Sequence, residues 1–136
     1  LCLAQDAKII KLPQLLEMMS EKSDEIHVIN FWATWCKPCL AEMPSIDRAA
    51  NELSDKGVVF IAASDEKLER VRAFKEKNQF KFEIVSTKAE LSALGFYALP
   101  TTFIFDEKGV LVHIETGARE WDTRESLLLV TETKKL

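Results

Sequence analysis

The chain has 136 residues, enough for one domain with a hydrophobic core, and its hydrophobic content of 47% and charged content of 29% are ordinary for a globular protein. The formal net charge is −4 and no block of lysines or arginines stands out, which argues against nucleic acid or an anionic membrane surface as a partner. No apolar run is long enough to span a bilayer. Three cysteines are too few for a disulfide scaffold, and no second C-x-x-C or H-x-x-x-H pattern completes a zinc site, so no metal is expected.

Hydrophobic spacing predicts helices and strands in alternation along the chain. Apolar residues three and four apart are typical of helices, and short continuous apolar runs are typical of buried strands. The first half is expected to contain a helix over 13–22, a strand over 26–33, a long helix over 37–54 and a strand over 58–63. Pro44 should kink the long helix, and Gly57 follows its end. The second half is expected to contain a helix over 65–78, a strand over 82–85, a short helix over 87–95, two strands over 101–105 and 110–116 joined by a turn at 106–109, and a last helix from Asp122. This order predicts an α/β fold with a central mixed β-sheet and helices on both faces.

Polar residues indicate where three of these helices begin. Asp65 is expected to cap the helix over 65–78. The patterns Thr87-x-x-Glu90 and Asp122-x-x-Glu125 are typical of capping boxes that open the short helix and the last helix. The last helix is expected to turn three apolar residues toward the core, namely Leu127, Leu128 and Val130.

The stretch over 35–39 (WCKPC) carries the clearest chemical signal. It follows a buried strand and opens a helix, which places Cys36 at a helix N-terminus, where unpaired N–H groups and the helix dipole favour an anion. A thiolate is such an anion and is the nucleophile of thiol–disulfide exchange, and Lys37 adds positive charge beside it. Cys39 lies one turn further on the same face. We expect Cys36 to attack and Cys39 to resolve.

Several motifs at matching distances resemble those of a thioredoxin-like oxidoreductase. They are residues 31–39 (FWATWCKPC), Pro44, and residues 99–103 (LPTTF) with Asp106 and Gly109 after them. The chain is similar in particular to the exported TlpA-like group, which includes ResA-type and DsbE-type cytochrome c maturation reductases, through residues 30–32 (NFW), 42–44 (EMP) and the segment 67–90. The resemblance covers roughly residues 26–118. It implies a thioredoxin fold and a redox-active Cys36–Cys39 disulfide with no other cofactor.

The resemblance also implies how substrate is held. Pro100 corresponds to the family's cis-proline, which lies against the cysteine pair, and the backbone of Leu99 before it pairs with an extended substrate. Trp35 covers the thiols in this scheme, whereas Trp32 is expected in the core. The implied substrate-binding residues are Trp35, Lys37, Pro38, Leu99, Pro100 and Thr101.

Asn30 departs from thioredoxin itself, which has a buried acid at this place on the strand that helps to deprotonate the second cysteine. An amide cannot accept that proton, so any base must come from elsewhere. Glu66 follows the carboxyl end of the second strand, an edge where catalytic groups gather in α/β sheets, and it aligns with an acidic residue near the active site of ResA-type proteins. We expect Glu66 to act with Cys36 and Cys39, and the alternative is a solvated glutamate in the first turn of a helix.

The favoured function is reduction of protein disulfides through the dithiol, with disulfide-bearing or thiol-bearing proteins as substrates and an upstream thiol as electron donor. A disulfide oxidant or isomerase uses the same chemistry and stays open. A copper-handling protein is less favoured because no histidine or methionine is placed as a third ligand, and His27 and His113 fall in predicted strands. A binding module without turnover is disfavoured by the intact cysteine pair.

The first residues predict an exported protein. Residues 1–5 are apolar and small, which is typical of the end of a signal peptide, and the alternative is a frayed N-terminus. In both cases a single domain is expected over 6–136. Cys2 is a weaker candidate for lipid attachment. Together with the TlpA-like resemblance this favours a periplasmic or other extracytoplasmic location, where a reductant needs its own supply of electrons.

Overall fold

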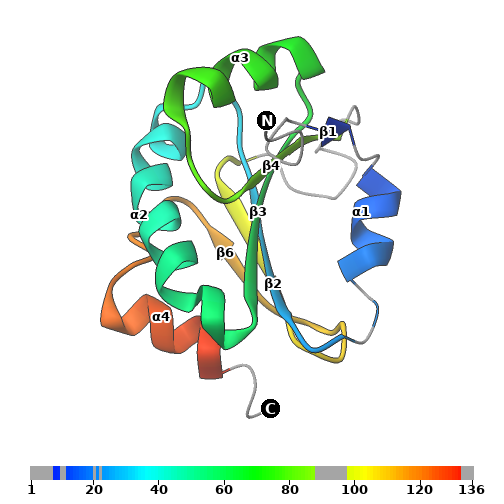
Figure 1. The fold of residues 1–136 in the computed structure, drawn as a ribbon, viewed down its shortest axis with the longest axis vertical. Helices are drawn as coiled ribbons and strands as arrows, with labels where there is room; N and C mark the ends of the chain where they lie inside the picture. The colour runs from blue at the N-terminus through cyan, green and yellow to red at the C-terminus, as the bar shows by residue number, and fades with distance from the viewer. Residues whose placement is uncertain (1–7, 10–11, 20, 22, 88–97, 133–136) are drawn as a thin grey trace.

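A central β-sheet organises the computed structural model, which describes residues 8–9, 12–19, 21, 23–87 and 98–132 (Figure 1). Its strands in chain order are β1 (Lys8–Ile9), β2 (Ile26–Phe31), β3 (Val58–Ser64), β4 (Glu83–Ser86), β5 (Thr101–Phe105) and β6 (Leu111–Thr116). In space the order is β1-β4-β3-β2-β5-β6. The first four of these strands are parallel, and β5 and β6 add to β2 in antiparallel fashion. The predicted mixed sheet is confirmed, and only the two-residue strand β1 has no counterpart in the prediction.

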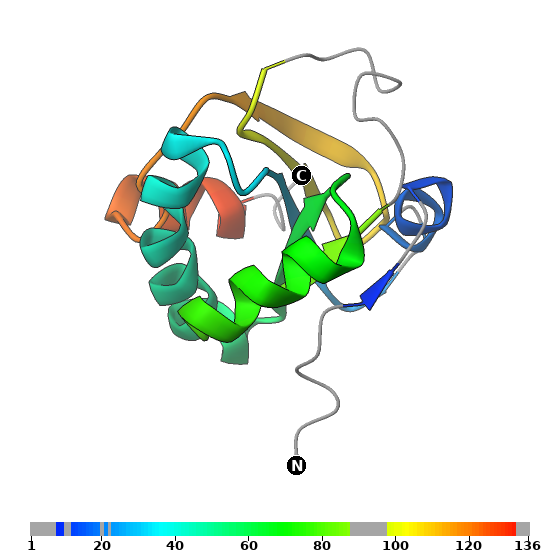
Figure 2. The same ribbon diagram turned by 90° about the horizontal axis from the view of Figure 1, so that it is seen from above.

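Helices cover both faces of this sheet, as predicted (Figure 2). They are α1 (Leu12–Met19), α2 (Lys37–Leu53), α3 (Leu68–Asn78) and α4 (Arg124–Thr131). One core contains apolar side chains of α2, α3 and α4 with those of the strands they cover, while a second core on the opposite face contains Leu15 of α1 and the paired rings of Phe31 and Phe103. The two cores together bury the central strands β2 and β3 on both sides, which is why these strands have continuous apolar sequences.

Helix α2 carries the cysteine pair and packs one face on the sheet. Met43, Ile46 and Leu53 are almost fully buried, at the spacing that places residues on one helical face. Pro44 lies inside the helix, which nevertheless continues to Leu53. A short 3-10 turn then leads to Gly57, whose φ of 71° lies in the left-handed region that glycine adopts without steric cost.

The start of α3 differs from the prediction. The helix begins at Leu68 with Lys67 as N-cap and no side-chain cap, so Asp65 does not cap it. The cause is partly local and partly tertiary: the backbone N–H of Glu66 donates to Ser64 Oγ two residues earlier, and the hydroxyl of Ser86 in β4 donates to the carbonyl oxygen of Glu66. These bonds hold the chain out of helical geometry for the first residues after β3.

The last helix also begins later than expected. Thr123 is the N-cap, and its hydroxyl accepts from the N–H of Ser126, while Asp122 instead accepts from Arg48 Nε of α2 at 2.7 Å. Val130 is buried and Leu127 is partly buried against the core, but Leu128 is 44% exposed, so its predicted core position is wrong. The short helix predicted over 87–95 lies outside the described residues, apart from Thr87.

Candidate functional site

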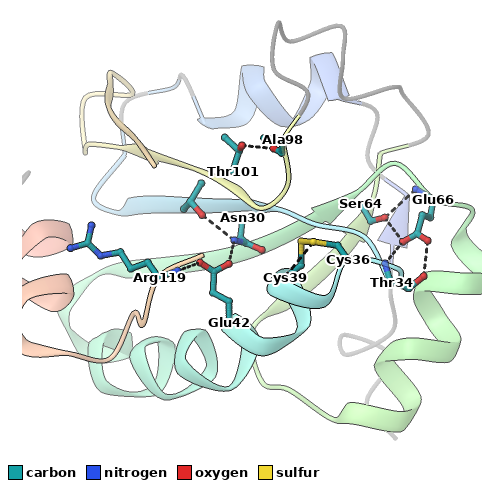
Figure 3. Close-up of a disulfide and its surroundings, with 11 residues drawn as sticks. Asn30, Thr34, Cys36, Cys39, Glu42, Ser64, Glu66, Ala98, Thr101 and Arg119 are labelled. Atoms are coloured by element: carbon teal, nitrogen blue, oxygen red, sulfur yellow. Dashed lines mark hydrogen bonds between the residues drawn. A yellow bond between two sulfur atoms is a disulfide. The ribbon is translucent and has the colours of Figure 1, made fainter. Parts of the chain in front are cut away.

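Cys36 and Cys39 form a disulfide at the beginning of α2, with Sγ atoms 2.17 Å apart and Cα atoms 5.3 Å apart (Figure 3). Cys36 is the N-cap residue of the helix, as predicted, and its sulfur accepts from the N–H of Cys39 at 3.3 Å. The same N–H and the helix dipole would stabilise a Cys36 thiolate after reduction. Cys36 is 4% exposed and Cys39 is fully buried, so only Cys36 has any accessible surface. This difference suits an attacking and a resolving cysteine.

Three residues next to the cysteines in the sequence are exposed to solvent, namely Trp35, Lys37 and Pro38. Trp35 is 71% exposed, which rules out a place for it in the core, whereas Trp32 is fully buried against Phe74. Lys37 and Pro38 are exposed in the first turn of α2. A large exposed aromatic ring next to a nearly buried sulfur provides an apolar contact for whatever approaches that sulfur.

The segment before β5 approaches the same end of the sheet. The Leu99–Pro100 peptide bond is cis, as the resemblance implies. Thr101 pairs with Phe31 across the sheet, so Pro100 lies at the end of β2 from which the chain runs on to the cysteines. The Thr101 hydroxyl donates to the carbonyl oxygen of Ala98 at 2.7 Å and fixes this bend (Figure 3). Within the described part of the chain, no hydrogen bond occupies the backbone N–H or C=O of Leu99.

Glu66 lies on the Cys36 side of the disulfide and is tied to the loop that precedes it (Figure 3). Its carboxylate accepts from the backbone N–H of Thr34 and from the Thr34 hydroxyl, both at 2.7 Å, and from the hydroxyl of Ser64 at 2.9 Å. It is therefore not a freely solvated residue in a helical turn. These contacts hold the Thr34–Trp35 turn in place from the neighbouring strand β3.

Glu42 is a further residue of the site, and the motifs in the sequence did not predict it. It is only 2% exposed, and Figure 3 shows it one turn beyond Cys39 on the other side of the disulfide from Glu66. One carboxylate oxygen accepts from Asn30 Nδ2 at 2.9 Å, and the other accepts from the backbone N–H of Arg119 at 2.9 Å and from Trp121 Nε1 at 2.8 Å. The sequence does indicate that Glu42 is buried, because Glu42 falls on the same helical face as Cys39 and Ile46. A carboxylate on an apolar face must be buried with hydrogen-bond partners.

Burial raises the pKa of the Glu42 carboxyl above its ordinary value, because removing the charged form from water is unfavourable. The hydrogen bonds from Trp121, Arg119 and Asn30 act in the opposite direction, since each favours the carboxylate, and they offset only part of the effect of burial. The nearby charge of Glu115 adds to the rise. The result is a carboxyl group beside the cysteine pair that holds a proton more readily than a surface glutamate.

Neither histidine belongs to this site. His27 lies in β2 and His113 in β6, where its Nε2 pairs with Glu115 at 2.8 Å. Among the described residues, no three histidine, cysteine, aspartate or glutamate side chains gather in a way that could hold a metal ion. The helices that the structure describes include none that is both long and apolar enough to cross a membrane.

Comparison with known proteins gives consistent matches. The model of the AhpC/TSA family matches residues 4–114. The thioredoxin-like protein YneN of Bacillus subtilis is 43% identical over 94 residues, which are 66% of this chain and 55% of that protein. The thiol-disulfide oxidoreductase ResA of Halalkalibacterium halodurans is 36% identical over 92 residues, 65% of this chain and 52% of that protein. The chain thus spans little more than half the length of these curated relatives.

A solved structure shares the fold. The crystal structure of a thiol:disulfide interchange protein of the thioredoxin family from Chlorobium tepidum superposes with a TM-score of 0.67 at 19% identity. The match covers 85% of this chain and 83% of that one. The described sheet and helices are therefore a thioredoxin fold.

Proposed function

Because the chain belongs to the AhpC/TSA family and has the thioredoxin fold, we propose that it is a thiol–disulfide oxidoreductase that works through Cys36 and Cys39. The single observation that carries the proposal is the disulfide at the N-terminus of α2, with one nearly buried and one fully buried cysteine. A relative named as a thiol-disulfide oxidoreductase, at 36% identity, supports it.

The reaction follows from the two positions. The Cys36 thiolate attacks one sulfur of a substrate disulfide, and the other substrate sulfur leaves as a thiolate that takes up a proton. Cys39 then loses its proton and attacks Cys36 Sγ, which forms the Cys36–Cys39 disulfide and releases the second substrate sulfur. Two electrons from an upstream thiol donor return the pair to the dithiol. A substrate in this scheme lies against Trp35, Lys37 and Pro38.

The segment of Leu99, Pro100 and Thr101 completes the substrate-binding region in this proposal. The backbone groups of Leu99, which make no hydrogen bond to the residues that the structure describes, support pairing with an extended peptide, as in other cases of strand addition to a protein edge. The main-chain bonds would provide affinity, and the exposed ring of Trp35 would add an apolar contact.

The proton of Cys39 has two candidate acceptors. Glu66 stays a prediction as a catalytic group, but its carboxylate lies on the Cys36 side of the disulfide and binds Thr34 and Ser64, which supports a role in positioning the loop. Glu42 is the better base, because it follows Cys39 by three residues on one helix and its raised pKa moves it toward the working pH.

We place the net reaction in the direction of disulfide reduction, in an exported compartment, on the strength of the TlpA-like motifs. The alternative direction is oxidation or isomerisation. The reduction potential of the Cys36–Cys39 pair separates the two: a value near the roughly −270 mV of thioredoxin supports reduction, and one near the roughly −120 mV of DsbA contradicts it.

Replacing Cys39 with alanine tests the function itself. With no resolving thiol, Cys36 should remain joined to substrate, so the Cys39→Ala variant should collect mixed disulfides that vanish on treatment with dithiothreitol. The matched control is Cys36→Ala, which retains Cys39 but has no attacking thiol and should trap far less. Equal trapping by both variants, or by neither, would contradict the proposal. Cys2→Ser in every variant removes the third cysteine from the experiment.

A further inference from the structure

One buried acceptor beside the disulfide has no partner. Asn30 is 2% exposed, and its Oδ1 atom is one of two buried side-chain polar atoms among the described residues that make no hydrogen bond, the other being Trp32 Nε1. Most buried polar atoms in folded proteins are paired, and an unpaired one costs roughly 1–3 kcal/mol. An unpaired oxygen at this position therefore calls for an explanation in the chemistry of the site.

The neighbours of Asn30 fix the orientation of its amide. The Nδ2 atom donates to Glu42 Oε1 and to Thr102 Oγ1, both at 2.9 Å. An ionised carboxylate only accepts hydrogen bonds, so with Glu42 ionised the NH2 group faces Glu42 and the oxygen faces the other way, as in the structure. Figure 3 shows that oxygen pointing toward the disulfide, on the side of Cys39.

Reduction creates a donor at this place. In the disulfide neither sulfur has a hydrogen, so Oδ1 has nothing to accept. When two electrons and two protons open the bond, Cys39 becomes a thiol, and a thiol is a weak donor. Cys36 is the poorer candidate, because its thiolate carries no proton and its sulfur already accepts from the N–H of Cys39.

We propose that Asn30 Oδ1 accepts a hydrogen bond from the Cys39 thiol in the reduced protein, and that Asn30 thereby favours the dithiol over the disulfide. The inference rests on the proposed function only in that the Cys36–Cys39 bond must open, and it holds for either direction of electron flow. Asn30 is in this sense a residue that sets the redox balance rather than a proton acceptor.

The equilibrium between the oxidised and the reduced protein reports on the proposed bond from the Cys39 thiol to Asn30 Oδ1. The bonds from Nδ2 to Glu42 and Thr102 do not involve a sulfur, so they can form in the oxidised and the reduced protein alike. The bond from Cys39 to Oδ1 exists in the reduced protein alone. Replacing Asn30 with leucine, which is of similar size and has no acceptor, should therefore shift the equilibrium toward the disulfide.

The test is the equilibrium of the protein with glutathione buffers, followed by alkylation of free thiols and mass spectrometry, in a Cys2→Ser background. A typical net hydrogen bond implies that Asn30→Leu lowers the equilibrium constant for the dithiol about fivefold, equivalent to a potential about 20 mV more negative. Thr102→Val is the matched control, because it removes a partner of Nδ2 and leaves Oδ1 in place. It should stay within about twofold of the parent.

Four outcomes would contradict the inference. An unchanged equilibrium in Asn30→Leu, as expected if buried water satisfies Oδ1 in both states, overturns the inference, and so does an equal shift in Thr102→Val. If Asn30→Leu does not fold, the side-chain carbonyl 13C resonance of Asn30 in the parent decides: it should move on reduction, and an unmoved resonance overturns the inference. A parent whose disulfide does not reduce contradicts the proposed function as well, which distinguishes the two failures.

Discussion

Among single residues, Glu42 has the environment that most constrains the chemistry of the site. It is an acidic residue on the buried face of α2, and three donors from β2 and from the segment before α4 converge on its two oxygens. A charge in such a place is tolerated only when it is hydrogen-bonded, so its partners are as important as the carboxylate itself. The raised pKa and the position one turn after Cys39 together favour a role in proton transfer.

Replacing Glu42 with glutamine should slow the resolving step and leave the attacking step nearly unchanged. General bases contribute about 10²-fold or more, so the mixed disulfide should persist correspondingly longer near neutral pH, and the defect should shrink at high pH, where Cys39 ionises without help. Quenched-flow kinetics with a model peptide disulfide separates the attacking step from the resolving step. Glu52→Gln, on an exposed position of the same helix, is the control and should resolve at the parent rate. A Glu42→Gln variant that resolves normally would contradict this role.

At the scale of structural elements, the turn before α2 depends on a neighbouring strand. Glu66, just after β3, reaches across to Thr34 and binds both its N–H and its hydroxyl. The same residue is kept out of α3 by Ser64 and Ser86, which is why the predicted cap at Asp65 does not form. The position of Trp35 and Cys36 is thus determined partly by β3 and not only by the helix that follows.

Two substitutions at Glu66 separate positioning from catalysis. Glutamine can still accept from the Thr34 N–H and can donate to the Thr34 hydroxyl, so Glu66→Gln should keep most of the activity if Glu66 holds the turn. Alanine removes every one of these bonds, and Glu66→Ala should lower kcat/KM about tenfold, the loss expected from about 1.4 kcal/mol of lost positioning. Insulin reduction or a peptide disulfide assay measures both. Equal and large losses in the two variants would favour a catalytic carboxylate instead.

At the scale of the whole molecule, the site is assembled from segments that are far apart in the chain. Asn30 comes from β2, Glu42 from α2, and Arg119 and Trp121 from the connection between β6 and α4. Arg119 also pairs with Glu115 at 3.0 Å and stacks its guanidinium over Trp121, which secures the connection. The C-terminal part of the fold therefore closes over the carboxylate beside the cysteines.

Removing the indole N–H of Trp121 should change how the free energy of unfolding depends on pH, because this N–H binds the Glu42 carboxylate. Because the folded pKa of Glu42 is raised above 4.5, its contribution to the free energy of unfolding falls as pH rises from about that value through the folded pKa. Trp121→Phe removes a donor that lowers this pKa, so the folded pKa should rise further. The variant should be destabilised at every pH by the lost packing, with an added penalty of about 2 kcal/mol that appears only as Glu42 ionises.

Urea unfolding of the oxidised protein between pH 4 and pH 8 measures this difference. Trp35→Phe is the control, because Trp35 is largely exposed, and its effect should stay within about 0.5 kcal/mol across the range. A Trp121→Phe penalty that does not change with pH would mean that the indole N–H does not stabilise the charged carboxylate.

Local patterns in the sequence determined the elements and the chemistry. The short C-x-x-C spacing placed Cys36 at a helix N-terminus and Cys39 on the same face, because four residues of a helix have one geometry wherever they occur. Continuous apolar runs identified β2 and β3, and the proline patterns identified the cis bond at Pro100 through family resemblance. Helix starts were less predictable, because Ser86 of β4 binds the backbone just after Asp65 and Arg48 of α2 binds the side chain of Asp122.

Only the tertiary structure decided what surrounds the cysteines. Glu66 binds the turn that precedes Cys36, and its partners come from the folded arrangement of β3 and the Thr34 turn. The sequence separates Glu42 from Arg119 and Trp121 by more than seventy positions, and no local pattern predicts such a contact. The sequence by itself thus determined the reacting sulfurs, because their geometry is local. The groups that hold or exchange a proton near them depend on how distant segments meet, and the packing of α2 against the β6–α4 connection brings those segments together.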